Sequence, residues 1–331
     1  MTSAARVRLA ILDDYQGAAL DAADWSALDA DADVVVFDEP FPDAEALVEA
    51  LGGFDIVVAM RERTAFPRDV LSALPALRLL VTTGMRNAAI DLRAAHELGI
   101  TVCGTRGNAS PTAELTWALI LGLVRDVASD DAAVQAGGWQ RRVAGDLDGA
   151  TLGIVGLGRL GERVASVGRA FGMSVIAWSP NLTPERAERG GAVAVEKAEL
   201  FRRADIVSVH LVLADRTRGI IGAEELRRMR PDAFLVNTSR APIIDQAALR
   251  RAIDERWIAG VGLDVYDVEP LPHDHWLRRP DAPGAARVLR SPHMGYVTRD
   301  NYRVFYGDAV EDISAFLAGA PIRQLTGERG V

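Results

Sequence analysis

The chain has 331 residues, 49% hydrophobic and 25% charged, which is typical of a globular protein long enough for two domains. With 37 basic and 46 acidic residues, its formal net charge of −9 argues against nucleic acid or an anionic membrane as a main partner. A single cysteine, Cys103, excludes an internal disulfide. Because the first apolar run is interrupted at Asp13 and no run could span a bilayer, we expect a cytoplasmic protein.

The first hundred residues alternate between strand-like and helix-like segments, which predicts a doubly wound α/β unit. Strands are expected at 7–12, 34–37, 55–59, 77–82 and 100–103, and helices at 18–28, 43–51, 68–73 and 90–98. A polar connection at 104–111 then indicates a domain boundary. A long helix starts at Pro111 and carries Leu115, Leu119, Leu123 and Val127 on one apolar stripe, which predicts burial in a core or against another subunit.

A second α/β unit is expected to follow the loop at 136–149. Its predicted strands are 151–155, 174–178, 206–209, 234–237, 261–265 and 287–290, with a helix from Asp245 to about 254. Four prolines make residues 268–286 a loop, and residues 298–317 form a long amphipathic helix.

A glycine motif lies between the first strand of this second unit and the helix that follows. Gly156 allows a tight turn, Gly158 lets a pyrophosphate approach the backbone, and Gly161 allows close packing of helix on strand. Arg159 and Leu160 begin the helix, whose free N–H groups attract an anion. In this context the motif predicts dinucleotide binding; the alternative is a glycine-rich turn without a ligand.

Chemically active side chains follow three later strands of the second unit. Arg240 comes after 234–237 with Thr238 and Ser239, Asp264 and Glu269 come after 261–263, and His293 comes after 287–290. Since ligands bind beyond the carboxyl ends of parallel strands, these groups could hold a carboxylate and move a proton. Alternatively, Arg240 and Glu269 could form an ordinary ion pair and His293 could be a turn residue.

Several segments together resemble the D-isomer-specific 2-hydroxyacid dehydrogenase family, which includes glyoxylate and hydroxypyruvate reductases and phosphoglycerate dehydrogenases. Besides the glycine motif, the matching segments are 108–114, 205–210, 236–241, 262–270 and 291–295. The resemblance implies a Rossmann nucleotide-binding domain, residues 105–295, inserted in a flavodoxin-like substrate domain, residues 1–104 and 296–331. It also implies a short form without the regulatory domain of longer relatives, and a homodimer.

The resemblance implies hydride transfer between NAD(P)H and the carbonyl of a small 2-oxo acid, with Arg240, Glu269 and His293 as the catalytic trio. His293 would be the general acid, a nearby Glu269 would favour its imidazolium form, and Arg240 would hold the substrate carboxylate. Thr83, Gly84 and Met85 would bind the other side of that carboxylate. The alternative is an NAD(H)-sensing scaffold, similar to the family's corepressors, without significant turnover.

The choice between NAD and NADP is open, because Ser179 stands where NAD-preferring relatives carry an acidic residue. The expected cofactor-binding residues are Gly156, Gly158, Arg159, Leu160, Gly161, Ser179, His210, Thr238, Ser239, Asp264 and Gly295. Tyr296 and the segment 83–86 depart from the family pattern, and Met85, Arg86, Trp276 and Tyr296 would change the size and charge of the substrate pocket if they line it. His273, Asp274 and His275 lack a further ligand in the sequence, so we expect no metal.

Overall fold

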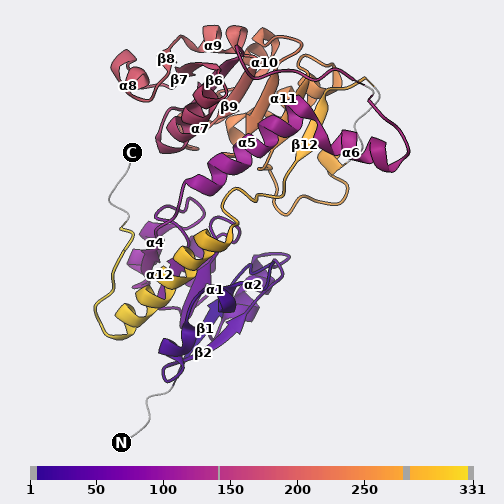
Figure 1. Ribbon diagram of the computed structural model, residues 1–331. Helices are drawn as coiled ribbons and strands as arrows, with labels where there is room; N and C mark the ends of the chain where they lie inside the picture. The colour runs from indigo at the N-terminus through magenta and orange to yellow at the C-terminus, as the bar shows by residue number, and fades with distance from the viewer. Residues whose placement is uncertain (1–5, 141, 279–283, 327–331) are drawn as a thin grey trace, which may run out of the picture. The chain divides into compact units, whose positions relative to one another are not determined.

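A computed structural model describes residues 6–140, 142–278 and 284–326, and the chain divides into two compact units. The first unit is Met1–Asn108 with Thr298–Val331, and the second is Ala109–Val297 (Figure 1). The second unit is therefore an insertion in the first. Its limits lie a few residues beyond the boundaries expected at 104 and 296.

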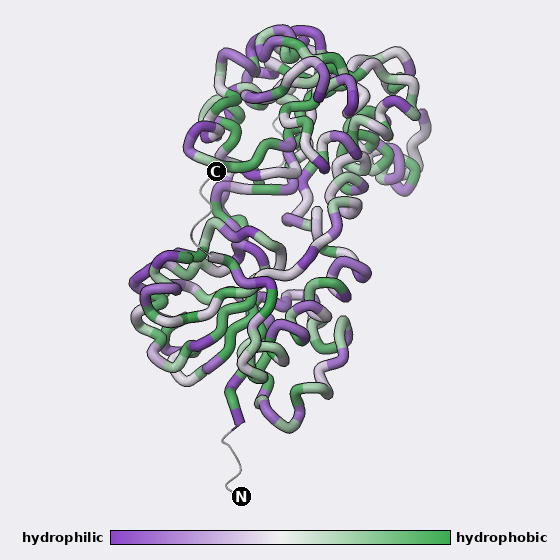
Figure 2. Tube along the Cα trace, turned by 90° about the vertical axis from the view of Figure 1, so that its left-hand side faces the viewer, coloured by the Kyte–Doolittle hydropathy of each residue, from purple (hydrophilic) through white to green (hydrophobic). Residues whose placement is uncertain are grey.

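The first unit is built on a five-stranded parallel sheet with the strand order β2-β1-β3-β4-β5. Its strands are β1 (Val7–Ile11), β2 (Ala32–Val36), β3 (Ile56–Ala59), β4 (Leu79–Thr82) and β5 (Thr101–Gly104). This is the flavodoxin-like order, in which the connections change direction between β1 and β3. Figure 2 shows hydrophobic and hydrophilic stretches alternating along the backbone of this unit.

Helices cover this sheet because their apolar faces match its buried side chains. They are α1 (Ala19–Ala22), the 3₁₀ helix η1 (Trp25–Leu28), α2 (Ala44–Leu51), α3 (Arg68–Ser72), α4 (Leu92–Glu97) and α12 (Arg299–Leu317). Leu47 and Leu51 of α2 share one core with Val70, Leu71 and strand residues. The single helix expected at 18–28 is wrong: the chain is extended at Asp24, whose side chain accepts from Ser26 N–H and starts a separate turn.

The end of the described chain pairs with the edge strand of the first unit. After α12, Leu325 N–H donates to Val102 O at 2.8 Å, and Gly104 N–H donates to Arg323 O at 3.0 Å. Arg323 Nε donates to Asp312 Oδ1 at 2.9 Å, and Arg323 Nη1 is ion-paired with Glu311 at 2.9 Å, both on α12. Residues 323–325 are thus fastened between β5 and α12.

The second unit contains a seven-stranded parallel sheet in the order β12-β11-β10-β9-β6-β7-β8. Its strands are β6 (Thr151–Val155), β7 (Ser174–Trp178), β8 (Val193–Ala194), β9 (Ile206–Val209), β10 (Phe234–Asn237), β11 (Gly260–Leu263) and β12 (Arg287–Arg290). This is the Rossmann arrangement, whose direction changes between β6 and β9. β11 ends two residues before the expected limit. Asp264 N–H still donates to Asn237 O at 3.1 Å, and the Asp264 side chain accepts from the backbone amides of residues 294 and 295.

Helices lie on both faces of this sheet. They are α5 (Ser110–Arg125), α6 (Val127–Gln135), α7 (Arg159–Ala170), α8 (Pro184–Arg189), α9 (Lys197–Arg203), α10 (Ala223–Arg228) and α11 (Gln246–Asp254), with 3₁₀ turns η2 (Asp215–Thr217), η3 (Ala241–Ile243) and η4 (Trp276–Arg278). The strand β8 and the helices α6, α8, α9 and α10 differ from the expected elements, because they are short or only weakly amphipathic.

The two faces hold separate cores. Leu119, Ile120 and Leu123 of α5 pack with α7 on one face, while residues of α9, α10 and α11 fill the other. Val127 does not belong to the buried stripe, contrary to expectation. The chain turns left-handed at Asp126 (φ 50°), which ends α5 and leaves Val127 63% exposed. No helix in the described ranges is long and apolar enough to cross a membrane.

Candidate active site

The glycine turn lies where the connections of the Rossmann sheet change direction, between β6 and β9. Gly156 has φ +104°, and a Cβ there would lie 2.7 Å from the His210 carbonyl carbon. At Gly161 a Cβ would lie 2.3 Å from Gly156 O, so these positions require glycine. Around Gly158, by contrast, the described chain places nothing within 4 Å of a Cβ, which leaves space beside the backbone.

The first turn of α7 is open to an anion. Gly158 is the N-cap residue, and no side chain in the described structure caps the helix there. The N–H groups of Arg159 and Leu160 therefore combine with the helix dipole at this turn. With the space beside Gly158, this cradle fits a dinucleotide pyrophosphate.

Ser179 directly follows β7, on the strand next to the glycine turn. Gly156 N–H donates to Trp178 O at 2.8 Å, which places the ends of β6 and β7 side by side. Arg186 Nη1 donates to Asn181 O at 3.2 Å and braces the connection. Residues 179–182 contain no acid, and Arg159 on the glycine turn is exposed.

His210, at the end of β9, is held in a neutral form. Ser208 Oγ lies 2.8 Å from its Nε2, and its Nδ1 is buried without a hydrogen-bond partner in the described parts of the chain. Burial lowers the pKa of His210 to about 3. A histidine that stays neutral is a poor proton donor at neutral pH.

Thr238, Ser239 and Arg240 follow β10 in a tightly bonded turn. Ser239 Oγ donates to Leu211 O at 2.5 Å, which ties the turn to the residue after His210. Asn237 Nδ2 donates to Arg240 O at 3.0 Å, and Arg240 Nη1 donates to Ser239 O at 2.8 Å. These bonds fix the backbone from which the half-buried Arg240 guanidinium projects.

Asp264 shapes the turn that carries His293. Its carboxylate is 1% exposed and accepts from Met294 N–H and Gly295 N–H, each at 2.8 Å. Burial raises the pKa of Asp264, against the lowering effect of these bonds. The turn needs this support because His293 has φ +55°, a left-handed conformation that non-glycine residues rarely adopt.

His293 is paired with Glu269. Nδ1 of His293 lies 2.5 Å from Glu269 Oε2, and the two side chains are 17% and 28% exposed. Glu269 Oε1 accepts from Tyr266 N–H at 2.8 Å, which orients the carboxylate. The Tyr296 ring meets the imidazole edge-on, with 5.3 Å between ring centroids.

The sheet register brings the residues after β10, β11 and β12 to one edge. Asn237 is paired with Leu263, and Leu263 with Arg290. Arg240, Asp264 and His293 therefore follow neighbouring strand ends, at the same edge of this sheet as the glycine turn. This arrangement offers a base or acid, a guanidinium and a nucleotide cradle within one unit.

In the first unit, Thr83, Gly84 and Met85 follow β4. Thr83 N–H donates to Ala59 O at 3.0 Å and Gly84 N–H to Thr105 Oγ1 at 2.8 Å, so two of the three amides are already engaged. Sequence reasoning missed Arg61, which follows β3 with φ +53° and donates through Nη1 to Thr83 O at 3.2 Å. Its place shortly after the end of a parallel strand is the same signal that marks Arg240.

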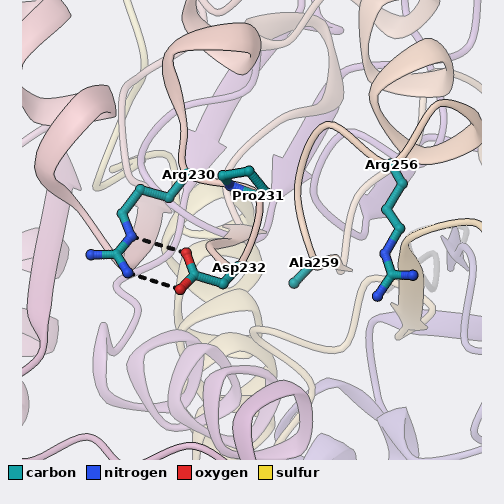
Figure 3. Close-up of a pocket in the computed structure, with 5 residues that line it drawn as sticks. All are labelled: Arg230, Pro231, Asp232, Arg256 and Ala259. Carbon is teal, nitrogen blue, oxygen red and sulfur yellow. Dashed lines mark hydrogen bonds and ion pairs between the residues drawn. The ribbon is translucent and has the colours of Figure 1, made fainter.

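A hollow in the second unit lies away from these residues. A cavity of about 690 Å³ is lined by Arg230, Pro231, Asp232, Arg256 and Ala259 (Figure 3). These residues precede β10 and β11, so they lie at the opposite edge of the sheet from the glycine turn. Arg230 is already bonded to Asp232 at 2.8 and 2.9 Å. We therefore assign no function to this hollow.

His273, Asp274 and His275 form no cluster with metal-binding geometry, and neither does any other group in the part of the chain that the structure describes. His275 Nε2 lies 3.4 Å from Asp267, and its Nδ1 accepts from Leu277 N–H. Trp276 packs against the core of the second unit.

Comparisons with known proteins agree with this geometry. Residues 117–295 match the family described as D-isomer specific 2-hydroxyacid dehydrogenase, NAD binding domain. Glyoxylate reductase of Aeropyrum pernix is 40% identical over 261 residues, 76% of each chain. Glyoxylate reductase of Thermococcus litoralis is 32% identical over 292 residues, covering 85% of this chain and 86% of that protein. A crystal structure titled phosphoglycerate oxidoreductase from Vibrio cholerae O395 superposes with a TM-score of 0.87 at 35% identity, covering 95% of this chain and all of that one.

Proposed function

Since the chain belongs to the D-isomer-specific 2-hydroxyacid dehydrogenase family, we propose that it is an NAD(P)H-dependent reductase of small 2-oxo acids. The observation that carries this proposal is the His293–Glu269 pair, held at the same sheet edge as the glycine turn. The names of its relatives favour glyoxylate and hydroxypyruvate as first substrates to test.

His293 would supply the proton. Because a carboxylate only accepts, the bond to Glu269 places a hydrogen on Nδ1, and Nε2 is the atom that exchanges the proton with the substrate oxygen. Arg240 would bind the substrate carboxylate, and Thr83, Gly84 and Met85 are the substrate-binding residues we propose in the first unit. In the reverse direction, neutral His293 takes the hydroxyl proton.

The cofactor would be held by the open turn at Gly158 and the first turn of α7, with Ser179 toward the ribose. His210, Thr238, Ser239, Asp264 and Gly295 would line its nicotinamide end. The bound nicotinamide supplies the hydride. Because Ser179 neither repels nor strongly attracts a 2′-phosphate, we expect discrimination between NADH and NADPH, measured as kcat/KM, to stay below about a thousandfold, roughly 4 kcal/mol.

The test is NAD(P)H oxidation with glyoxylate, hydroxypyruvate and related 2-oxo acids. The His293→Ala variant should lose about 10²- to 10⁴-fold in kcat, the usual contribution of a general acid, while still binding NADH. Tight NADH binding by the wild-type protein without turnover of any acid would favour the corepressor-like scaffold instead.

We also propose a homodimer formed through α6 and the segment after it. Several apolar side chains are exposed there: Val127 (63%), Val134 (54%), Trp139 (74%) and Val143 (100%). Such a group is unusual on a surface that faces only water. Sedimentation of a monomer at micromolar concentration would contradict this, and a Val134→Glu, Trp139→Glu variant should dissociate the dimer.

The cytoplasm is the compartment we propose. The single cysteine is fully buried and unpaired, as suits a reducing environment. Fractionation of cells that express the protein at its native level would test this.

A further inference from the structure

Three threonine hydroxyls connect the turn of His293 to the turn of Arg240. Thr112 Oγ1, in the first turn of α5, donates to Gly295 O at 2.8 Å. Thr116 Oγ1, one helical turn later, donates to Thr112 O at 2.7 Å and lies 2.8 Å from Thr238 Oγ1. Thr238 directly follows β10, two residues before Arg240.

The donor and the acceptor in the Thr116–Thr238 hydrogen bond follow from counting hydroxyl hydrogens. A hydroxyl has one hydrogen, and Thr116 uses its hydrogen on Thr112 O. Thr238 must therefore donate to Thr116 Oγ1. Thr116 is 0% exposed and Thr238 is 6% exposed, so water cannot readily replace either partner.

At the other end of the chain, the Gly295 residue is held from both sides. Its N–H is bound by Asp264 and its carbonyl by Thr112. A Cβ at Gly295 would lie 3.0 Å from Asp264 Oδ2 and 3.3 Å from Thr112 Cγ2, so the two side chains clamp it closely. Two residues before it, His293 has the left-handed backbone that needs such support.

We propose that Thr112 is a positioning residue for His293, and that Thr116 and Thr238 extend this support to the turn of Arg240. This inference rests on the proposed function. Asp264 alone fixes the amide side of the turn, and Thr112 fixes its carbonyl side. Together they hold the imidazole where Glu269 orients it.

The decisive comparison is Thr112→Val against Thr112→Ser, since valine keeps the shape and serine keeps the hydroxyl. With glyoxylate as substrate, Thr112→Val should lower kcat about 5- to 50-fold, as expected for a buried carbonyl that loses its donor, and leave the KM for NADH within about twofold. Thr112→Ser should stay within about threefold of the wild-type kcat. Thr151→Val, at the start of β6, is the matched control and should change neither constant.

An unchanged kcat in Thr112→Val, or an equal loss in Thr112→Ser, overturns the proposal. If Thr112→Val does not fold, Thr116→Val breaks the same series of hydroxyl contacts at its middle and should lower kcat with the KM for NADH unchanged; full activity there overturns the link to Arg240.

A second measurement separates this inference from the proposed function. The protein has five histidines, so imidazole NMR signals can be assigned individually. Thr112→Val should displace the His293 signals and leave those of His96 and His273 in place. If the wild-type protein reduces no 2-oxo acid, the proposed function is refuted. If the His293 signals do not move in Thr112→Val, the positioning role of Thr112 is refuted, whether or not the protein is active.

Discussion

Replacing Glu269 by glutamine should invert the polarity of the contact on His293. In the wild-type protein, Oε1 of Glu269 accepts from Tyr266 N–H at 2.8 Å and Oε2 accepts from His293 Nδ1 at 2.5 Å. In the variant, Tyr266 N–H requires the amide oxygen, so the NH₂ group faces Nδ1. A donor then meets a donor whenever the imidazole is protonated, and the form that delivers the proton is disfavoured.

The structure sets the size of this effect. Loss of a hydrogen bond between charged partners removes about 1.5–3 kcal/mol, which corresponds to about a 10- to 100-fold lower kcat. The alternative rotamer does not rescue the variant, because it leaves Tyr266 N–H facing an NH₂ group. Steady-state reduction of glyoxylate by NADH measures kcat directly.

The matched control for this variant is Asp267→Asn, two residues away. Asp267 lies 3.4 Å from His275 Nε2, so this change neutralises a carboxylate beside another histidine in the same loop. It should leave kcat within about twofold of the wild-type value, because Asp267 takes no part in the hydrogen bonds that hold His293 and Glu269, and its own side chain is 38% exposed. A Glu269→Gln enzyme with a kcat equal to that of this control would refute the polarity argument.

Three further predictions follow from other parts of the chain. Gly156→Ala should abolish NADH binding, measured by fluorescence, because its Cβ would lie 2.7 Å from the backbone of His210 at a φ of +104°; wild-type affinity would contradict this. The buried Asp312 has a pKa raised by burial from 3.8 to about 7, so it keeps its proton in the folded state over a range where the unfolded chain has lost it. Folding stability from urea unfolding should therefore fall as pH rises from about 4 to 7, by up to about 4 kcal/mol from this group, and then level off; an equally steep pH dependence in Asp312→Asn would contradict this. Cys103 should resist thiol reagents at pH 8 until the protein unfolds, because burial and the charge of Asp312 raise its thiol pKa to about 12; rapid labelling of the native protein would contradict this.

The parallel α/β architecture could be predicted from the sequence because buried parallel strands are short, continuous apolar runs. The runs at β6, β7, β9 and β10 were each expected at the observed residues, and the glycine turn was expected between β6 and α7. Shorter elements escaped prediction, since a two-residue strand such as β8 carries no periodicity.

The site was only partly predictable, for a different reason. His293 and Glu269 were expected on separate strand ends, and their 2.5 Å contact depends on the loop between them, whose path is not encoded by a local pattern. Thr112 and Thr116 escaped altogether, because a hydroxyl in a helix looks like an ordinary surface residue until its neighbours are known.

The fastening of residues 323–325 along β5 bears on how shortened versions of this protein should be designed. β5 is the outer strand of its sheet, and the tail occupies the backbone groups that would otherwise recruit a strand from a neighbouring molecule. A version cut after α12 would leave the backbone N–H and C=O groups of β5 unpaired at the edge of the sheet and would self-associate through them. The oligomeric state measured for such a version would reflect association through β5 and not through the exposed apolar surface of α6.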